Sequence, residues 1–186
     1  MKAVVFHEHG TLANVVYTDV AEPTIKPDEV LLQVKAAALN RLDLWVLEGW
    51  PGLNLKLPHV MGSDGAGVIA QIGADVTDFA VGDRVAVNPS LFCGQCAYCR
   101  SGRDNMCQQF AILGEHVDGF FAGYTAVPAR NLLKIPDTFP FSAAAAASLV
   151  FVTAWRSLIK AGGLQAGESV LIVGAGGGVN TAAIQI

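Results

Sequence analysis

Residues 93–107 read CGQCAYCRSGRDNMC and contain all four cysteines of the chain, Cys93, Cys96, Cys99 and Cys107. The spacing C-x2-C-x2-C-x7-C brings four thiolates within reach of one tetrahedral ion. Four sulfur ligands in a closed site are typical of structural Zn²⁺. Glycines inside the stretch let the backbone turn sharply around a metal. The pattern predicts a structural zinc lobe over residues 92–108.

Three other uses of the cysteines stay open: disulfides, an iron–sulfur cluster and free thiols. Disulfides need an oxidising compartment, and the N-terminal residues MKAVVFHEHG lack a hydrophobic signal segment. An iron–sulfur cluster usually has a shorter last spacing followed by proline, whereas Gln108 follows Cys107. The pattern therefore favours zinc and a cytoplasmic protein with reduced cysteines.

The composition excludes several classes of partner. Of the 186 residues, 52% are hydrophobic and 15% charged, so the chain can bury a sizeable core. A net charge of −4 gives no reason to expect nucleic acid or an anionic membrane as partner. The longest apolar run, Ala143–Ala154, is too short for a bilayer and is interrupted by Ser148. We expect no nucleic acid and no membrane partner.

Upstream of the cysteines the chain is rich in short apolar runs separated by proline, glycine and aspartate, which predicts a compact, mainly β, barrel-like domain. The expected strands are Lys2–Phe6, Val30–Ala37, Gly67–Ile72 and Arg84–Val87. A helical period follows the second of them, at Asn40–Leu47, because Leu39, Leu42, Val46 and Leu47 share roughly one face.

Downstream the texture changes to helix, strand and glycine-rich turn. Ser142–Ile159 is alanine-rich and predicts a helix capped by Ser142, with a break near Ser148–Val152. Ser169–Val173 (SVLIV) predicts a buried strand of the parallel-sheet type. The residues GAGGGV follow, and TAAIQI opens a helix. Because a βαβ unit needs its return strand, we expect a piece of a longer protein.

The glycine-rich turn predicts dinucleotide binding. Glycines between a strand and a helix let the backbone approach a pyrophosphate, and the helix N-terminus supplies amide donors. A glycine run alone is weak, since flexible loops use glycine too, but the flanking strand and helix strengthen the prediction. Asn180 departs from the fingerprint, where Gly or Ala would allow the closest helix–strand packing.

Together these pieces resemble the medium-chain, zinc-type alcohol dehydrogenase and quinone reductase superfamily over the whole chain. Besides the cysteines and the glycine-rich turn, its marks are residues 40–44 (NRLDL), 62–68 (GSDGAGV), 81–85 (VGDRV) and 152–155 (VTAW). The resemblance implies a GroES-like catalytic domain over 1–130, followed over 131–186 by a linker helix and the first β-turn-α of a Rossmann domain. Members move a hydride between a nicotinamide and a carbonyl, alcohol or activated alkene.

The resemblance also implies site residues. The cysteines correspond to the family's structural zinc site. The cofactor, NAD or NADP, would lie against Thr153, Gly176, Gly177, Gly178 and Val179. For Thr153 there is a plain alternative, a helical threonine that bonds back to the preceding turn.

The catalytic zinc site is where the chain departs from the family. Alcohol dehydrogenases carry Cys where Asn40 stands, His where Ser63 stands, Glu where Asp64 stands, and usually Cys or Asp near Leu149. Asn and Ser are poor zinc ligands and Leu is none. A catalytic zinc needs three protein ligands, and only Asp64, with Asp43 nearby in sequence, could contribute. The chain resembles the metal-free quinone and enoyl reductases, which also have Asn near the Asn40 position.

Asn40, Asp43 and Asp64 are accordingly the candidate catalytic residues. Asp43 has an even alternative as a helix-capping group, and Asp64 as an acceptor of backbone hydrogen bonds in a turn. The leading hypothesis is an NAD(P)-dependent quinone or alkene reductase without catalytic zinc, acting on a small molecule as a homo-oligomer.

Two other hypotheses stay open. One is an alcohol dehydrogenase that recruits zinc through Asp43, Asp64 and His59; the other is a non-catalytic, zinc-stabilised fragment. In all cases we expect the 186-residue form to be inactive by itself.

Overall fold

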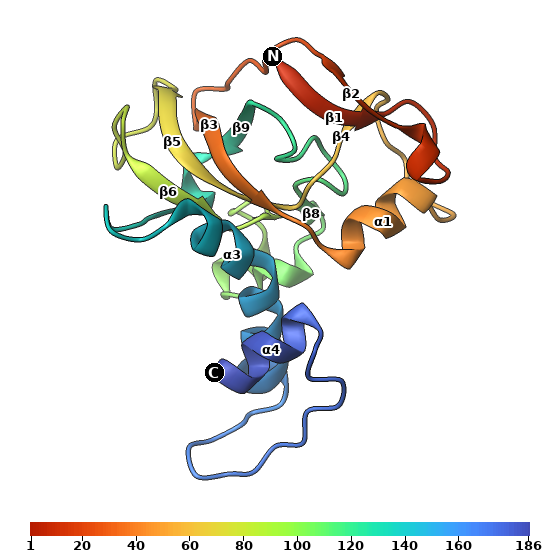
Figure 1. The fold of residues 1–186 in the computed structure, drawn as a ribbon. Coiled ribbons are helices and arrows are strands. Elements are labelled where there is room, and N and C mark those ends of the chain that lie inside the picture. Colours follow the sequence, from red (N-terminus) through yellow and green to blue (C-terminus); the bar gives the residue numbers. More distant parts are fainter.

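The structure is a computed structural model that describes residues 1–186. A β-rich body carries a helical extension at its C-terminal end (Figure 1). The strands are β1 (Lys2–Phe6), β2 (Val15–Asp19), β3 (Glu29–Ala38), β4 (His59–Val60), β5 (Asp64–Ile72), β6 (Arg84–Val87), β7 (Ser90–Leu91), β8 (Ala111–Ile112), β9 (Tyr124–Pro128) and β10 (Leu132–Lys134). The α-helices are α1 (Arg41–Glu48), α2 (Ala97–Arg100), α3 (Phe141–Trp155) and α4 (Gly178–Gln185).

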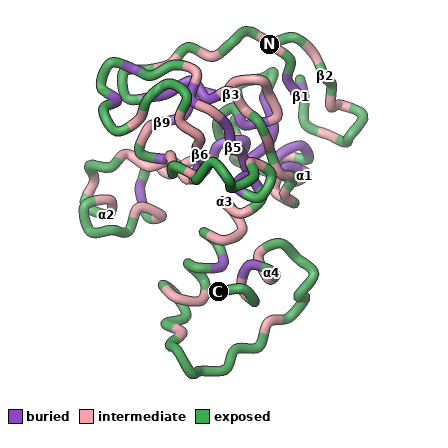
Figure 2. The backbone as a smooth tube through the Cα atoms, turned by 60° about the vertical axis from the view of Figure 1, so that its left-hand side comes forward, coloured by how far each residue is buried: buried purple, intermediate pink, exposed green.

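Three antiparallel sheets build the body. The largest has five strands in the order β10-β6-β5-β3-β9, and a second has the order β2-β1-β4. Strands β7 and β8 pair beside the cysteine lobe. The main core is built largely by side chains of the five-stranded sheet and includes Leu32, Ile69, Val85, Phe120 and Val127. Buried backbone gathers at strands β3 and β5 (Figure 2).

The predicted strands are confirmed. Lys2–Phe6 and Arg84–Val87 have the expected bounds, and the other two extend by one to three residues at one or both ends. β10 continues the five-stranded sheet just after residue 130, by pairing with β6. The division of the chain at residue 130 stays a prediction.

Helix α1 begins where the sequence predicts, with Asn40 as its N-cap. Leu42, Val46 and Leu47 pack with Phe6 and Met61 in a second apolar cluster. Leu39 does not join them: it is 85% exposed, because it precedes the first helical turn. The helix therefore fixes Asn40 at the junction of β3 and α1.

Helix α3 packs on the five-stranded sheet through small side chains. Ala144 and Ala145 lie against Ala66 of β5 and Ala86 of β6, so the helix backbone comes close to the sheet. The N-cap is Pro140 rather than the predicted Ser142, because the helix already begins at Phe141. It also runs unbroken through Ser148–Val152, so the predicted break is wrong.

A π-helical segment, Arg156–Ala161, continues α3. Together they give an apolar helix of 21 residues, Phe141–Ala161, which by length and composition alone is long enough to cross a membrane. This is weak support for a membrane span, since core helices of soluble proteins have the same length and composition. Its first turns lie on the sheet of a globular body.

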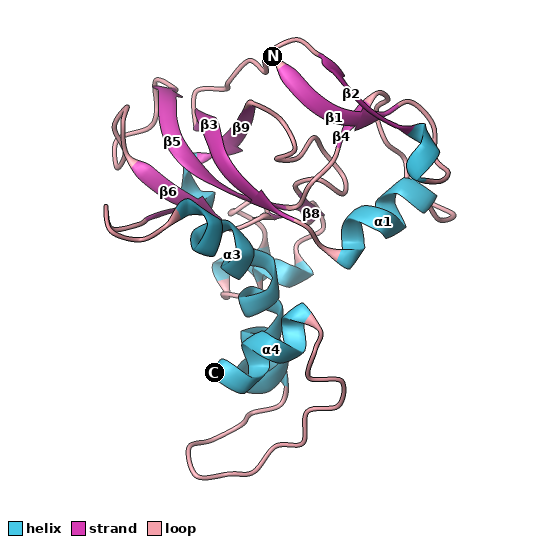
Figure 3. Ribbon diagram, in the orientation of Figure 1, coloured by secondary structure: helices cyan, strands magenta, loops and turns pink.

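The predicted strand at Ser169–Val173 is wrong. These residues are irregular, and Leu171 and Val173 are 87% and 80% exposed (Figure 3). A strand requires a neighbour for its backbone hydrogen bonds, and no other strand lies in this part of the structure. Helix α4 instead lies against α3: a Cβ on its first residue, Gly178, would be 3.0 Å from Val150 Cγ1.

Candidate functional site

The four cysteine sulfurs converge. All four Sγ atoms lie within 4.8 Å of one another. The Sγ atoms of Cys96 and Cys99 are 3.5 Å apart, and those of Cys93 and Cys99 are 3.9 Å apart. A tetrahedral zinc with Zn–S bonds of about 2.3 Å needs S–S separations of about 3.8 Å. The spacing thus fits Zn²⁺.

Backbone amides point at these sulfurs. Cys96 N–H donates to Cys93 Sγ at 3.4 Å, and Cys99 N–H donates to Cys96 Sγ at 3.5 Å. Cys107 Sγ accepts from the N–H of Cys93 at 3.4 Å and of Gln109 at 3.3 Å. Because amide donors stabilise thiolates, the conformation of this loop favours the ionised form of the cysteines.

The thiol electrostatics favour a cation among the sulfurs. Backbone hydrogen bonds, first from Gln95 and then from Cys96, lower the pKa of Cys93 to about 6. Burial and the neighbouring thiols raise the pKa of Cys99 to about 12. Four thiols this close cannot all ionise without a positive charge between them, and a divalent metal supplies that charge. The donor set fits zinc.

A second polar cluster joins α1, β5 and α3. Asn40 Nδ2 donates to Asp64 Oδ2 at 2.9 Å. Leu149 N–H, from the middle of α3, donates to Asp64 Oδ1 at 2.8 Å. Asp64 is 1% exposed, so its carboxylate connects two distant elements inside the protein.

Burial, opposed by these two hydrogen bonds, raises the pKa of Asp64 from 3.8 to about 6, and the neighbouring Asp43 carboxylate adds to the rise. Asp43 is also buried, at 3% exposure, and burial raises its pKa. Its Oδ2 accepts the backbone N–H of Asn40 at 2.7 Å, as expected of a capping carboxylate in the first turn of α1. Asp43 Oδ1 and Ser63 Oγ are buried without a hydrogen-bond partner.

His59 is a core residue rather than a ligand. Its Nε2 lies 3.1 Å from Gly114 O, its Nδ1 lies 3.8 Å from Asp118 Oδ1, and its ring lies against Phe6. Burial lowers its pKa. Only the cysteine quartet brings three or more Cys, His, Asp or Glu ligand atoms within 4.8 Å of one another. The structure therefore does not assemble a site from Asp43, Asp64 and His59.

Of the predicted cofactor residues, Thr153 lies in α3, Gly178 and Val179 begin α4, and Gly176 and Gly177 lie in the turn before α4. Thr153 Oγ1 donates to Leu149 O at 2.8 Å, which is the plain alternative for that residue. Gly176 is open, since a Cβ there would meet nothing within 4 Å, and Gly177 is the N-cap of α4. Asn180 Nδ2 donates to the carbonyls of Val173 and Gly174 at 2.8 Å, so its side chain holds the turn in place.

Helix α3 joins the two candidate sites. Its Leu149 N–H contacts Asp64, and one residue later Val150 lies against Gly178 at the start of α4. Sequence patterns do not reveal the part played by Leu149, because its donor is a backbone group and the side chain gives no signal.

Comparison with known proteins identifies the family. The profile of the alcohol dehydrogenase GroES-like domain matches residues 26–137. The chain belongs to the medium-chain alcohol dehydrogenase family. The predicted GroES-like fold is thereby confirmed.

The similar proteins include alcohol dehydrogenases and a reductase. An alcohol dehydrogenase of Schizosaccharomyces pombe is 37% identical over 98% of this chain and 52% of its own length. Acryloyl-coenzyme A reductase of Sulfurisphaera tokodaii is 34% identical over 90% of this chain and 50% of its own length. A crystal structure of an NAD-dependent alcohol dehydrogenase matches with a TM-score of 0.95 and 44% identity, over 100% of this chain and 54% of that one. The chain thus spans about half the length of these relatives.

Within the alcohol dehydrogenase family, the polar cluster stands at the positions that the resemblance assigns to the catalytic metal. Asn40 and Leu149 each donate a hydrogen bond to Asp64 there, and Leu149 contributes only its backbone N–H. Both oxygens of the Asp64 carboxylate accept a hydrogen bond from a neutral protein group.

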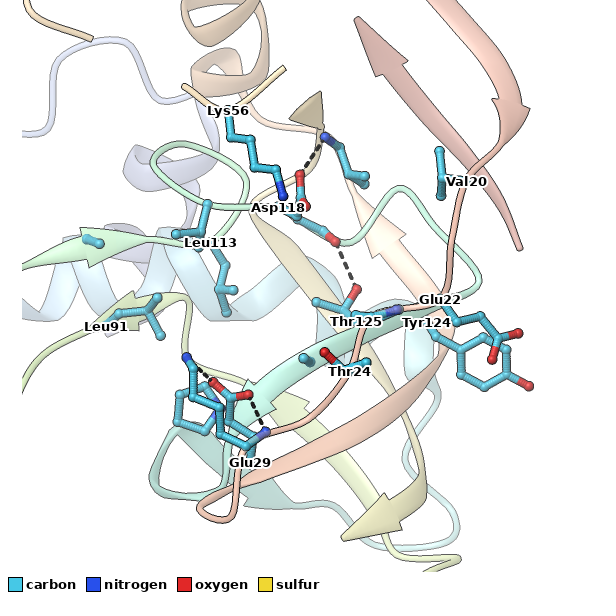
Figure 4. A pocket seen from close by; sticks show the side chains of 18 of the residues that line it. Val20, Glu22, Thr24, Glu29, Lys56, Leu91, Leu113, Asp118, Tyr124 and Thr125 are labelled. Atoms are coloured by element: carbon cyan, nitrogen blue, oxygen red, sulfur yellow. Dashed lines mark hydrogen bonds and ion pairs between the residues drawn. The ribbon is translucent and has the colours of Figure 1, made fainter. Parts of the chain in front are cut away.

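A cavity of this alcohol dehydrogenase-like chain lies elsewhere. It measures about 780 Å³ and lies between β9 and the segment that precedes β3, with Lys56, Asp118 and Thr125 on its walls (Figure 4). None of the candidate catalytic or cofactor residues lines it. The cavity is therefore separate from the polar cluster.

Proposed function

We propose that the whole protein is a cytoplasmic, homo-oligomeric NAD(P)-dependent oxidoreductase that reduces an activated alkene, a quinone or a carbonyl without a catalytic zinc. The observation that supports this most is the hydrogen bonding of Asp64. Its carboxylate accepts from two uncharged donors, Asn40 Nδ2 and Leu149 N–H, at positions where the family binds its catalytic metal. The similarity to an acryloyl-coenzyme A reductase agrees with an alkene as substrate.

Each part of the chain has a role in this proposal. Cys93, Cys96, Cys99 and Cys107 bind one structural Zn²⁺ that holds the lobe beside β7 and β8. The turn Gly176–Val179 receives the pyrophosphate at the N-terminus of α4, and Thr153 faces the cofactor from α3. A bound nicotinamide supplies the hydride. The Asn40 amide, half-buried at the start of α1, donates to the substrate oxygen on which negative charge develops.

A second candidate, an alcohol dehydrogenase with an atypical metal site, is favoured by one observation. Asp43 Oδ1 and Ser63 Oγ are buried without partners, and a buried unpaired oxygen is costly unless a ligand satisfies it. The S. pombe relative is an alcohol dehydrogenase. Metal content distinguishes this candidate from the first.

Replacing Asn40 tests the proposed chemistry. In the whole protein, Asn40→Ala should lower kcat for alkene or quinone reduction by about 10²- to 10³-fold with little change in KM, because removal of an oxyanion donor acts on the transition state. Steady-state kinetics measures this. The matched control is Asn54→Ala, which removes an exposed amide outside the cluster. An Asn40→Ala enzyme as active as this control contradicts the role of Asn40.

The 186-residue chain should bind a nicotinamide dinucleotide weakly or not at all. Its glycine-rich turn is not backed by a sheet, since Ser169–Val173 is irregular, so the turn is not held in its binding geometry. Isothermal titration calorimetry with NAD and NADP measures the affinity. A dissociation constant in the micromolar range would contradict this prediction.

A further inference from the structure

Asp64 is a buried carboxylate whose nearest partners are all neutral or negative. Asn40 from α1 and Leu149 from α3 donate to it, and the carboxylate of Asp43 is the charged group that faces it. The residue that pairs with Asp64 across the sheet is the apolar Ala38 of β3. The side chains of α3 that pack on this part of the sheet are also apolar, Ala144 and Ala145. No cation stabilises the ionised form, so the carboxyl can change its protonation state near neutral pH.

Protonation of Asp64 has a geometric consequence for Asn40. In the structure, Asp64 Oδ2 accepts from Asn40 Nδ2, while Oδ1 is engaged by the Leu149 amide. A proton on Oδ2 that is directed toward Asn40 places a donor opposite another donor, and two donors that face each other lose their hydrogen bond. The Asn40 amide must then move away or turn its oxygen toward the new O–H.

We infer that Asp64 is a positioning residue for Asn40: ionised, it holds the Asn40 amide in one orientation, and on taking up a proton at Oδ2 it releases that amide. The inference rests on the proposed role of Asn40. It goes beyond that role, because the carboxylate of Asp64 is buried with both oxygens engaged by protein groups, and it therefore acts through the amide that it holds. The raised pKa of Asp64, about 6, agrees with a transition in a physiological range.

Two carboxyls contact Asn40 through different atoms, and this makes the inference testable. The side-chain Nδ2 bonds to Asp64, whereas the backbone N–H bonds to Asp43. Nuclear magnetic resonance of the zinc-loaded 186-residue chain can follow the Asp64 Cγ carbon, the Asn40 side-chain amide and the Leu149 backbone amide from pH 4.5 to 8. We expect all three signals to shift together in one transition near pH 6.

Variants assign the transition. In Asp64→Asn the shifts of the Asn40 side chain and of Leu149 should disappear, because the amide at position 64 cannot ionise. Asp75→Asn, which neutralises an exposed carboxylate elsewhere, should leave them unchanged. Asn40 side-chain signals that stay constant across this range, or that still titrate in Asp64→Asn, would overturn the inference. A transition lost in Asp43→Asn instead would assign the control to Asp43 and overturn it as well.

Kinetics of the whole protein separates this inference from the proposed function. The kcat for reduction should fall as the pH decreases through about 6, and in Asp64→Asn it should be independent of pH at the low, acid-side level, because the variant resembles the protonated form. If the protein reduces no alkene, quinone or carbonyl while the resonance shifts remain, the proposed function fails and the coupling of Asp64 to Asn40 stands. If kcat keeps its transition in Asp64→Asn, the coupling does not govern catalysis.

Discussion

A Cys107→Ser variant is expected to lose its zinc on dialysis and to unfold the lobe over residues 92–108. Cys107 is the buried member of the quartet, and its sulfur also accepts two backbone amides. Zinc binding contributes about 10 kcal/mol or more to the folding of small zinc domains, so losing one of four ligands should destabilise the lobe by several kcal/mol.

Elemental analysis and limited trypsin digestion measure this effect. Arg100 and Arg103 lie in α2 and the turn after it, and cleavage at both should become fast in the variant. Met106→Ala is the matched control, because it truncates a half-exposed side chain next to Cys107 and leaves all four sulfurs. A Cys107→Ser protein that keeps a full equivalent of zinc and resists trypsin like this control would contradict the assignment of the ligands.

The free energy of unfolding of Asp64→Asn, relative to that of the unchanged chain, is expected to be higher at neutral pH than at acid pH. In the folded chain the pKa of Asp64 is raised from 3.8 to about 6, so the folded state binds this proton more tightly than the unfolded state does. Stability therefore falls as pH rises from about 4 to about 6, and above that range the ionised group costs roughly 3 kcal/mol. Between pH 5 and pH 8 this cost grows by about 1.5 kcal/mol.

Denaturant unfolding of the zinc-loaded chain at several pH values measures this cost. The free energy of unfolding of Asp64→Asn minus that of the unchanged chain should rise by about 1.5 kcal/mol from pH 5 to pH 8. The same difference for Asp75→Asn should stay near zero, because this carboxylate is exposed. A difference for Asp64→Asn that is constant with pH would show that Asp64 is not destabilised when ionised.

Local patterns predicted local structure well. The four cysteines are close in sequence, so their spacing alone indicated that their sulfurs converge. Strands β1 and β6 have their predicted bounds, because apolar residues between turn formers require little tertiary information. Helix α1 was predicted from its apolar period, and Asp43 is the capping group that was the alternative to its catalytic role.

The errors and omissions concern interactions between distant segments. Ser169–Val173 has the composition of a buried strand, but a strand depends on neighbours that only the fold can supply. The hydrogen bond from Leu149 to Asp64 joins residues 85 positions apart through a backbone amide, and no sequence motif predicts such a bond. The sequence predicted Asp64 as a candidate residue. Its hydrogen bonds to Asn40 and α3 could be seen only in the structure, because they join distant segments.

The zinc content of the whole protein tests the central claim most directly, because a structural zinc without a catalytic one separates the proposed reductase from a zinc-dependent alcohol dehydrogenase. The measurement is elemental analysis after extensive dialysis, combined with the zinc content of the Cys107→Ser variant. We predict one tightly held zinc per chain, which disappears in the variant. Two tightly held zincs per chain, with one remaining in Cys107→Ser, would contradict the account.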